Sequence, residues 1–382
     1  MSNTHRIIAA LDSYKGSLSS YAAGAAVRRG ILRRLPNSIV DVFSLGDGGE
    51  GTAAAFRSYG KSHQIEVFDT HCSKTNAEYI ELIKDSCRYA IFDMAECAGL
   101  SKSATHDLDI LHATTYGVGE IISALVYKGY DEIIVGLGGS GTNDSGIGAL
   151  QAMGAVFLDK NNEPIDASLG AVVLPEISSV DLSKAVSMLS HTKLTLLYDV
   201  SSPLTGSSGA SMMFSKQKGA DIPTREFLEN AVGSFSRIAD SLLKYEFSAI
   251  HGAGAAGGLG YGLSLIGGQL TPGARFVLDY LNLADTLKSA DLVITGEGKT
   301  DIQTAKGKLP AVVADYARRS GCPVICLSGS YAPSLDIERL FDAIFSISLG
   351  PDSLENSIRK TEALLEEASY NIAGLLDSIS KC

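Results

Sequence analysis

The chain has 382 residues, which is enough for two domains of ordinary size. Hydrophobic residues make up 45% of it and charged residues 20%, so folding can bury a large core. The net charge is -11 and the isoelectric point about 5.1. This acidity excludes a protein built to bind nucleic acid, because affinity for the phosphate backbone needs a basic surface.

The sequence also predicts a cytoplasmic protein that does not enter a membrane. It begins without a charged and then apolar leader, and its six cysteines form no C-x-x-C pair. One uncharged stretch, residues 252–268, is about half glycine and only 17 residues long. It is too short and too weakly apolar to span a bilayer, so we expect a glycine-rich loop that enters a buried helix.

The first elements in chain order form a β-α-β unit. An apolar run at 7–11 predicts a strand, a helical pattern follows from about residue 19 to 34, and a second strand is predicted at 39–43. Strands that alternate with helices are typical of a parallel sheet.

The pattern changes after about residue 62. Three strand-like runs follow with only turns between them, at 64–69, 79–84 and 88–93, which predicts an antiparallel meander. Further strands are predicted at 131–137 and 193–198, and further helices near 144–153 and 225–243.

Alternation of helices and strands returns near the C-terminus. Strands are predicted at 291–295, 323–327 and 342–347, and helices at 311–319 and 353–378. Because the two ends look alike, we predict an α/β fold with a discontinuous domain. Residues 1–62 and 285–382 would form a Rossmann-like domain, and residues 63–284 a mixed α/β domain inserted between them.

Forty glycines are more than usual, and they gather at 46–51, 136–148, 252–268 and 296–307. Glycine lets a backbone approach a ligand closely, so that N–H groups converge on an anion. For any one cluster, a plain turn is the better explanation. Four clusters that also carry Asp, Asn, Thr and Lys favour the handling of phosphate.

Two of these clusters contain G-x-G-x-x-G, at Gly136, Gly138 and Gly141 and again at Gly252, Gly254 and Gly257. The first follows a strand and precedes a helix, as a dinucleotide fingerprint does. Its loop, however, also holds Ser140, Thr142, Asn143 and Asp144. A carboxylate beside a pyrophosphate is repulsive unless a metal lies between them, so the loop favours metal and phosphate over NAD. A Walker A loop is absent.

The loop after the strand at 291–295 reads GEGKTDIQTAKGK. Its carboxylates are Glu297 and Asp301, its cations are Lys299, Lys306 and Lys308, and its neutral donors are Thr300, Gln303 and Thr304. Phosphoryl transfer needs cations for the transferring oxygens and a carboxylate for Mg²⁺. The alternative is a solvated loop of mixed charge.

Two loops near the N-terminus follow the first two strands. In DSYKGSLS, Asp12 ends the strand, where open α/β sheets bind ligands; the alternative is that it caps the helix. Lys15 can pair with a carboxylate or phosphate, and GDGGEGT adds Asp47 and Glu50. Because parallel strands end together, we expect both loops and the 296–308 loop at one edge of one sheet.

Seven stretches in this order resemble the type I glycerate kinases of bacteria. They are LDSYKGSLS at 11–19, GDGGEGT at 46–52, GLGGSGTNDSGIGALQAMG at 136–154, YDVSSPLTGSSGAS at 198–211, QKGA at 217–220, HGAGAAGGLGYG at 251–262 and DLVITGEGKTDIQT at 291–304. The resemblance runs from residue 7 to about 345. Departures at Leu11, where the family has proline, and at Gly141, Ser145, Ser201 and Lys216 leave the charged positions untouched.

The resemblance implies phosphorylation of D-glycerate by ATP with Mg²⁺, mostly at the 2-hydroxyl, in a cleft between a Rossmann-like and a central α/β domain.

The positions and chemistry of the loops suggest a role for each residue. Asp47 is the expected base, with Asp199 and Asp301 as rivals, and Lys15 is also expected to act in catalysis. Substrate would be bound by Ser13, Lys15, Ser17 and Glu50. Nucleotide and phosphate would be bound by Gly138, Ser140, Thr142, Asn143, Asp144, Lys218, Glu297, Asp301, Gln303, Thr304 and Lys308, and the metal by Asp144, Glu297 and Asp301.

Other interpretations stay open. The product could be the 3-phosphate, or the acceptor another short hydroxy acid or polyol. Two alternatives belong to other classes of protein, an NAD-dependent oxidoreductase and a nucleotide-binding regulator without catalytic activity. The regulator is disfavoured because it has little use for so many acidic and basic side chains. We expect a monomer or homodimer with no nucleic-acid or membrane partner.

Overall fold

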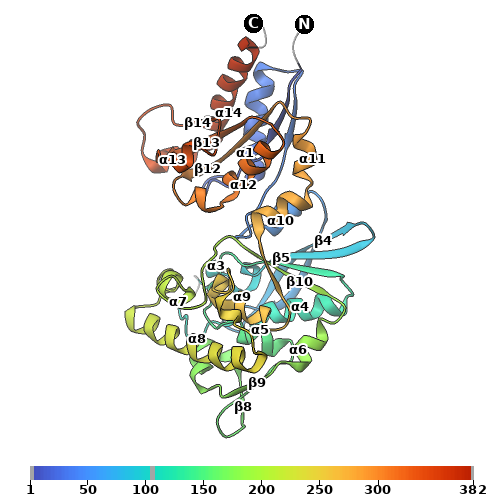
Figure 1. Cartoon of the computed structure of the whole chain (residues 1–382), viewed down its shortest axis with the longest axis vertical. Helices are drawn as coiled ribbons and strands as arrows, with labels where there is room; N and C mark the ends of the chain where they lie inside the picture. Colours follow the sequence, from blue (N-terminus) through green and yellow to red (C-terminus); the bar gives the residue numbers. More distant parts are fainter. Residues whose placement is uncertain (1–3, 104–107, 380–382) are drawn as a thin grey trace. The chain divides into compact units, whose positions relative to one another are not determined.

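The computed structural model describes residues 4–103 and 108–379 and divides into two compact units (Figure 1). Unit 1 comprises Met1–Asp47 and Ala274–Cys382, and unit 2 comprises Gly48–Gly273. The chain therefore leaves unit 1 well before residue 62, where the sequence placed the first join, and returns before residue 285. The reason is that residues 48–60 pack against the strands of unit 2.

Unit 1 is built on a five-stranded parallel sheet in the order β14-β13-β12-β1-β2. In the central strand β1, Ile7 is in register with Leu292 of β12 and with Val40 of β2. The strands are β1 (Arg6–Ala9), β2 (Ile39–Val42), β12 (Leu292–Thr300), β13 (Val324–Tyr331) and β14 (Ala343–Ser346). Both ends of the chain thus contribute to one parallel sheet, as the two similar patterns predicted.

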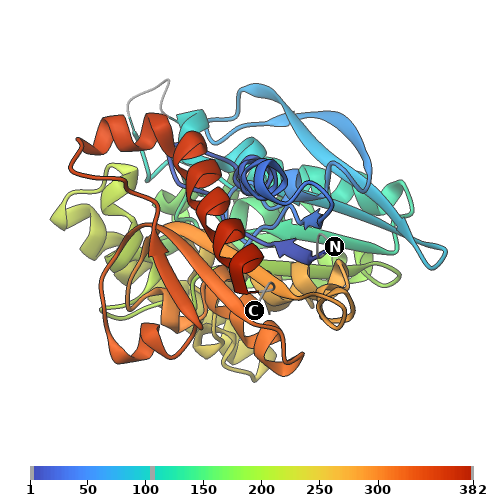
Figure 2. The same ribbon diagram turned by 90° about the horizontal axis from the view of Figure 1, so that it is seen from above.

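Helices cover both faces of this sheet. On one face α1 (Ser20–Arg34) packs against α14 (Leu354–Ile379), and on the other α12 (Leu309–Arg319) packs against β12 and β13 (Figures 1 and 2). The first two helices approach so closely that a Cβ on Gly30 would lie 2.1 Å from the carbonyl oxygen of Glu366. Unit 1 also contains α10 (Gly273–Tyr280), α11 (Leu283–Leu287), η6 (Thr304–Lys306) and α13 (Leu335–Glu338).

Unit 2 is built on a six-stranded mixed sheet in the order β11-β10-β6-β5-β4-β3. The strands β3, β4 and β5 form the predicted antiparallel meander, whereas β5, β6, β10 and β11 are parallel. Their bounds are β3 (Lys61–Phe68), β4 (Lys74–Lys84), β5 (Cys87–Asp93), β6 (Glu132–Gly136), β10 (Lys193–Tyr198) and β11 (Gln269–Pro272). The parallel half has one carboxyl edge, where its loops gather.

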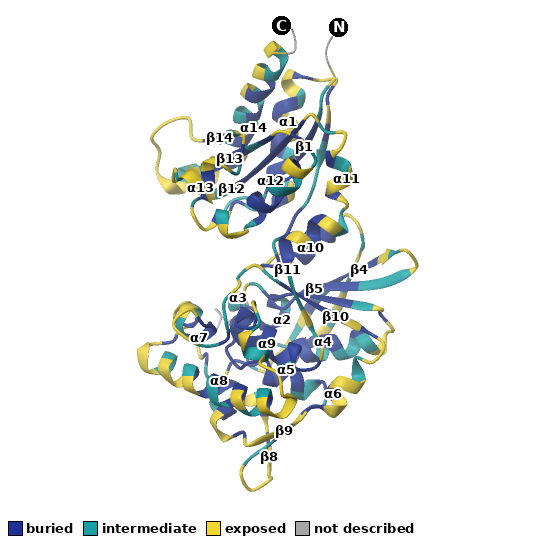
Figure 3. Ribbon diagram, viewed as in Figure 1, coloured by how far each residue is buried: buried dark blue, intermediate teal, exposed yellow. Residues whose placement is uncertain are grey.

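The remaining elements of unit 2 pack around this sheet, whose central strands β5, β6 and β10 are largely buried, whereas β3 and β11 at its edges are not (Figure 3). The helices are α2 (Ala95–Ala98), α3 (Leu100–Ser103), α4 (Tyr116–Tyr127), α5 (Ile147–Ala152), α6 (Ser183–Met188), α7 (Ala210–Phe214), α8 (Ile222–Leu243) and α9 (Leu259–Ser264). The 3-10 segments are η1 (Ala53–Phe56), η2 (Ala167–Glu176), η3 (Lys216–Lys218), η4 (Phe247–Ala249) and η5 (Ala255–Gly258). A small sheet joins β7 (Val156–Leu158), β8 (Pro164–Ile165) and β9 (Ser179–Asp181).

The uncharged stretch at 252–268 forms a glycine-rich loop followed by α9, which is buried along its whole length, as predicted. Among the residues that the structure describes, no helix has the length and apolar character needed to cross a membrane. The fold is α/β, with parallel strands in the sheets of both units.

Candidate active site

In unit 1, three acidic side chains come together at the carboxyl edge of the sheet. Asp12 follows β1, Asp47 follows β2, and Glu297 lies within β12, which neighbours β1. The backbone N–H of Asp12 donates to the carbonyl of Gly296 at 2.9 Å. Burial raises the pKa of Asp12 to about 7, and the charges of Asp47 and Glu297 add to this rise. The expected convergence of these loops is confirmed for the part that lies in unit 1.

Asp12 does not cap the helix that follows it. The cap of α1 is Ser19, whose hydroxyl accepts the N–H of Ala22, whereas Asp12 accepts the N–H of Ser13 at 2.6 Å. Asp12 was not among the predicted site residues, although its place at the end of a strand was a signal for it. A carboxyl group with a pKa near 7 is suited to proton transfer.

The substrate-binding residues predicted in the 12–17 loop differ in their surroundings. The exposed Lys15 lies close enough for its charge to lower the pKa of Asp12, and Ser13 is half-buried beside that carboxylate. The hydroxyl of Ser17, in contrast, donates to the carbonyl of Ile358 in α14 at 2.6 Å. Ser17 therefore ties the loop to a helix, and this contact leaves Lys15 and Ser13 as the better placed ligands.

The loop after β12 is held together by its own charges. Glu297, only 5% exposed, accepts the hydroxyl of Thr304 at 2.5 Å, and the ammonium of Lys308 lies 3.7 Å from its other oxygen. Burial raises the pKa of Glu297. Asp301 accepts the N–H of Gln303 at 2.9 Å, which is the main reason that its pKa is lowered. Glu297 is therefore a buried carboxylate at the base of this loop, whereas Lys299 and Lys306 are exposed, as in a solvated loop of mixed charge.

In unit 2, the second half of the GDGGEGT motif lies on the glycine loop that follows β6. A Cβ on Gly138 would lie 2.3 Å from the backbone nitrogen of Glu50, and one on Gly139 would lie 2.8 Å from its carboxylate. Asp199, which is exposed, follows β10, the neighbour of β6 in the sheet. The predicted residues Glu50 and Gly138 are thus brought together.

Lys218 lies beneath the same glycine loop, only 2% exposed. Its ammonium donates to the hydroxyl of Ser140 at 2.8 Å and to the carbonyl of Thr142 at 2.7 Å. Burial lowers the pKa of Lys218 to about 7. Through these two hydrogen bonds, Lys218 holds the glycine loop in place.

Three polar side-chain atoms of the loop are buried without a hydrogen-bond partner. They are the hydroxyls of Thr142 and Ser145 and the carbonyl oxygen of the Asn143 side chain, whose amide nitrogen donates to Ser211 at 3.1 Å. An unpaired buried polar group is costly unless a ligand or water satisfies it. The hydroxyl of Thr142 can donate to a phosphate oxygen, whereas the carbonyl oxygen of Asn143 can only accept a hydrogen bond, from a water or a ligand hydroxyl.

Asp144 is fully buried and already accepts several hydrogen bonds. One oxygen accepts the N–H and the hydroxyl of Thr115, both at 2.8 Å, and the other accepts the N–H of Gly146 at 3.0 Å. Burial raises its pKa, and these donors oppose the rise. The carboxylate holds the turn into α5, an arrangement that disfavours the predicted role in binding metal.

The second G-x-G-x-x-G packs against protein. A Cβ on Gly252 would lie 2.7 Å from the ring of Tyr198, one on Gly254 would lie 2.1 Å from the carbonyl of Pro203, and one on Gly257 would lie 2.0 Å from that of Thr142. These glycines let two loops approach each other, so this motif is explained without a ligand.

A magnesium site must be tested against the donors present. Within residues 4–103 and 108–379, no three His, Cys, Asp or Glu side chains are grouped so that they could hold a metal ion. Mg²⁺ in nucleotide sites takes one or two carboxylates and completes its shell with phosphate and water. Glu297 and Asp301 supply such carboxylates, so the donor chemistry fits an ion that arrives with a nucleotide.

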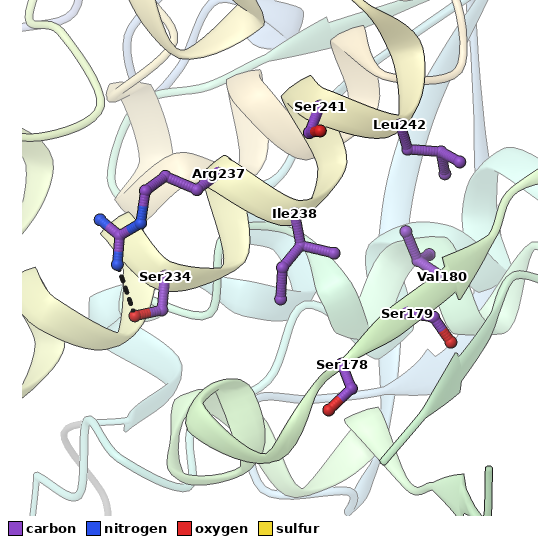
Figure 4. A pocket seen from close by; sticks show the side chains of 8 residues that line it. All are labelled: Ser178, Ser179, Val180, Ser234, Arg237, Ile238, Ser241 and Leu242. Atoms are coloured by element: carbon purple, nitrogen blue, oxygen red, sulfur yellow. Dashed lines mark hydrogen bonds between the residues drawn. The ribbon is translucent and has the colours of Figure 1, made fainter. Parts of the chain in front are cut away.

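A groove elsewhere in unit 2 lies between α8 and β9 (Figure 4). It is lined mainly by serine and aliphatic side chains, and its charged residue, Arg237, donates to Ser234 at 2.9 Å. It contains none of the predicted site residues.

Comparison with known proteins identifies the family. The model of the Glycerate kinase family matches residues 7–377. The chain belongs to the glycerate kinase family. It is 36% identical over 372 residues to a glycerate kinase from Halalkalibacterium halodurans, with 96% of this chain and 97% of the relative covered.

Two further members extend this comparison. Glycerate 2-kinase from Escherichia coli (strain K12) is 33% identical over 376 residues, with 97% of this chain and 98% of the relative covered. A solved structure provisionally assigned as glycerate kinase 2 from Salmonella typhimurium LT2 matches with a TM-score of 0.85 at 35% identity, covering 100% of both chains. Family membership makes this chain a kinase, and the resemblance inferred from the seven stretches is confirmed.

Proposed function

We propose that this protein transfers the γ-phosphoryl group of ATP to the 2-hydroxyl of D-glycerate. The observation that carries the proposal is the match to the glycerate kinase family over residues 7–377. The 2-hydroxyl is favoured because the relative from Escherichia coli is named a glycerate 2-kinase. A cytoplasmic location and a monomeric or homodimeric state stay predictions from the sequence.

The substrate is a small anion, and the loops of unit 1 offer what it needs. Lys15 supplies a cation for the glycerate carboxylate, and Ser13 beside it can donate a hydrogen bond. Asp47 accepts the proton of the attacking hydroxyl. Asp12 is a second candidate base, since a pKa of about 7 leaves its carboxyl group partly ionised at neutral pH. It lies close enough to Asp47 for the charge of Asp47 to raise this pKa.

Each unit offers a loop for phosphate or metal, in unit 2 the glycine loop that follows β6 and in unit 1 the loop at 296–308. The unpaired hydroxyl of Thr142 and the side chain of Ser140 are donors for phosphate oxygens, while Glu297 and Asp301 would hold Mg²⁺. When bound, Mg²⁺ neutralises charge on the phosphates. Gln303, Thr304 and Lys308 order the carboxylates of that loop through the contacts described above.

A substrate panel tests this function. Purified protein with ATP and Mg²⁺ should release ADP with D-glycerate, and at least tenfold more slowly with L-glycerate, glycolate or glycerol. Faster turnover of another hydroxy acid or polyol would replace glycerate as the substrate. A change in absorbance at the reduced nicotinamide band, in the presence of NAD, would instead support an oxidoreductase.

A further inference from the structure

The loop that follows Asp47 is held by a carboxylate from a different part of the sequence. Asp93, the last residue of β5, accepts the N–H of Gly51 at 2.9 Å and the N–H of Ala53 at 3.1 Å and 3.2 Å through its two oxygens. Its exposed fraction is 4%. Both oxygens are therefore used to bind the backbone of the loop at 48–53.

The space around Asp93 leaves the carboxylate little freedom. A Cβ on Gly136, at the end of β6, would lie 2.3 Å from one of its oxygens. The absence of a side chain at this glycine thus makes room for Asp93 between the ends of two paired strands, β5 and β6. Asp93 is placed by the sheet, and it in turn places the loop.

The loop itself is closed by a second set of contacts. The hydroxyl of Thr52 accepts the N–H of Gly48 at 3.0 Å and donates to the carbonyl of Gly49 at 2.9 Å. The loop is therefore a compact turn with its own internal bonds, anchored to the sheet at Asp93. Glu50 lies within this turn, and Asp47 is covalently joined to its first residue, so the anchor restrains the backbone next to both acids.

We propose that Asp93 is a positioning residue for the kinase reaction, which fixes the loop that carries Asp47 and Glu50. This role rests on the proposed function above for its effect on turnover. It gives a role to a buried acid at the end of a strand, for which the described residues offer no salt bridge. Burial raises the pKa of Asp93 to about 7, and the charges of Glu96 and Glu50 add to this rise.

The replacement Asp93→Asn tests this role with little change in shape. Whichever way the amide group turns, its NH₂ faces the N–H of Ala53, which lies 3.1 Å and 3.2 Å from the two oxygen positions. Two donors that face each other cannot bond, so the loop should loosen. We expect hydrogen exchange of the 48–53 amides to accelerate about tenfold, while β5 and β6 stay protected.

The same variant should lower kcat about tenfold or more and change the KM values for glycerate and ATP by less than about threefold. A matched control is Asp159→Asn, since Asp159 also accepts two loop N–H groups, from Asn161 and Glu163, at an exposed turn between β7 and β8. This control should leave kcat unchanged. A role in stability alone would lower the melting temperature without this division between kcat and KM.

Thr52→Val provides a second test if the first variant does not fold, because it removes the internal bonds of the turn with little change in volume. It should also lower kcat and accelerate exchange at 48–53. The proposal is overturned if exchange stays unchanged in Asp93→Asn, or if the loop loosens in either variant while kcat stays at the wild-type value. Absence of glycerate kinase activity in the wild type would overturn the function alone, since exchange still tests the anchor.

Discussion

The sheets of both units end in polar loops, but the two loop clusters use their acids differently. In unit 1, Asp12 and Asp47 lie near each other, and their mutual repulsion helps to hold the pKa of Asp12 near 7. In unit 2, the carboxylate oxygens of Asp93 and Asp144 accept hydrogen bonds from backbone N–H groups. Asp12 accepts the N–H of its neighbour Ser13 and lies beside other acids, which suits it to proton transfer. Asp93 holds backbone of a distant loop, although its pKa is also raised to about 7. The sequence motifs around these acids do not by themselves distinguish an acid that transfers a proton from one that holds a loop.

The largest effect should come from removing the proposed base in unit 1. Asp47→Asn keeps the size of the side chain but removes its ability to take a proton, so kcat should fall by roughly 10²- to 10⁴-fold. Steady-state release of ADP at saturating glycerate and ATP measures this. Asp285→Asn, on the exposed surface of the same unit, is the matched control and should behave as wild type. A kcat within threefold of wild type would remove Asp47 from the reaction.

Lys15→Ala should act on binding instead. If the ammonium group pairs with the glycerate carboxylate, its loss should raise the KM for glycerate by roughly 10- to 100-fold, as expected for a charge-assisted hydrogen bond. The KM for ATP should change little. An unchanged KM for glycerate, or an equal rise in both KM values, would contradict this assignment.

The pH dependence tests whether Asp12 takes part. Because a base must be ionised, kcat/KM should rise with pH through about 7, and at pH 6 it should be roughly a tenth of its plateau value. Asp12→Asn should abolish this rise. If the rise survives, it belongs to another group, and Asp93, which titrates in the same range, is the first to examine.

The same raised pKa makes the stability of the protein depend on pH. Between about pH 4 and 7 the folded protein keeps a proton on Asp12 that the unfolded chain has lost. The free energy of unfolding should therefore fall as pH rises through this window. Urea unfolding of Asp12→Asn at pH 5 and pH 8 should show a smaller difference than wild type, and an equal difference would contradict a raised pKa.

The smallest effect on turnover should come from an acid of unit 2. In Asp144→Asn the donors from Thr115 and Gly146 lose part of their acceptor, so the protein should be less stable by about 1–3 kcal/mol. The folded fraction should retain kcat within about threefold. Thermal unfolding measures the loss of stability, and active-site titration gives the folded fraction from which kcat is calculated. A loss of kcat as large as that of Asp47→Asn would instead indicate that Asp144 is a metal or phosphate ligand.

Much of the fold could be predicted, because alternation of helices and strands is a local pattern. The strands at both chain ends and the meander at β3, β4 and β5 were found in this way. The first join lies earlier than the sequence indicated, because the loop at 48–53 bonds to Asp93 forty residues away, a contact that no local pattern contains.

The roles within the site were harder to predict, because they depend on which partners each side chain meets in the fold. Ser17 and Asp144 stand in loops whose composition indicates ligand binding, yet each bonds to its own chain. Asp12 shows the opposite case, since only the neighbouring strands reveal the charges that shift its pKa. Burial of Lys218 likewise follows from tertiary packing.

Phosphorus NMR of the reaction products tests the central claim most directly. Purified protein incubated with ATP, Mg²⁺ and D-glycerate should yield ADP and 2-phosphoglycerate in equal amounts. The resonance of 3-phosphoglycerate would correct the acceptor hydroxyl. The absence of both ADP and phosphoglycerate would contradict the assignment of this protein as a glycerate kinase.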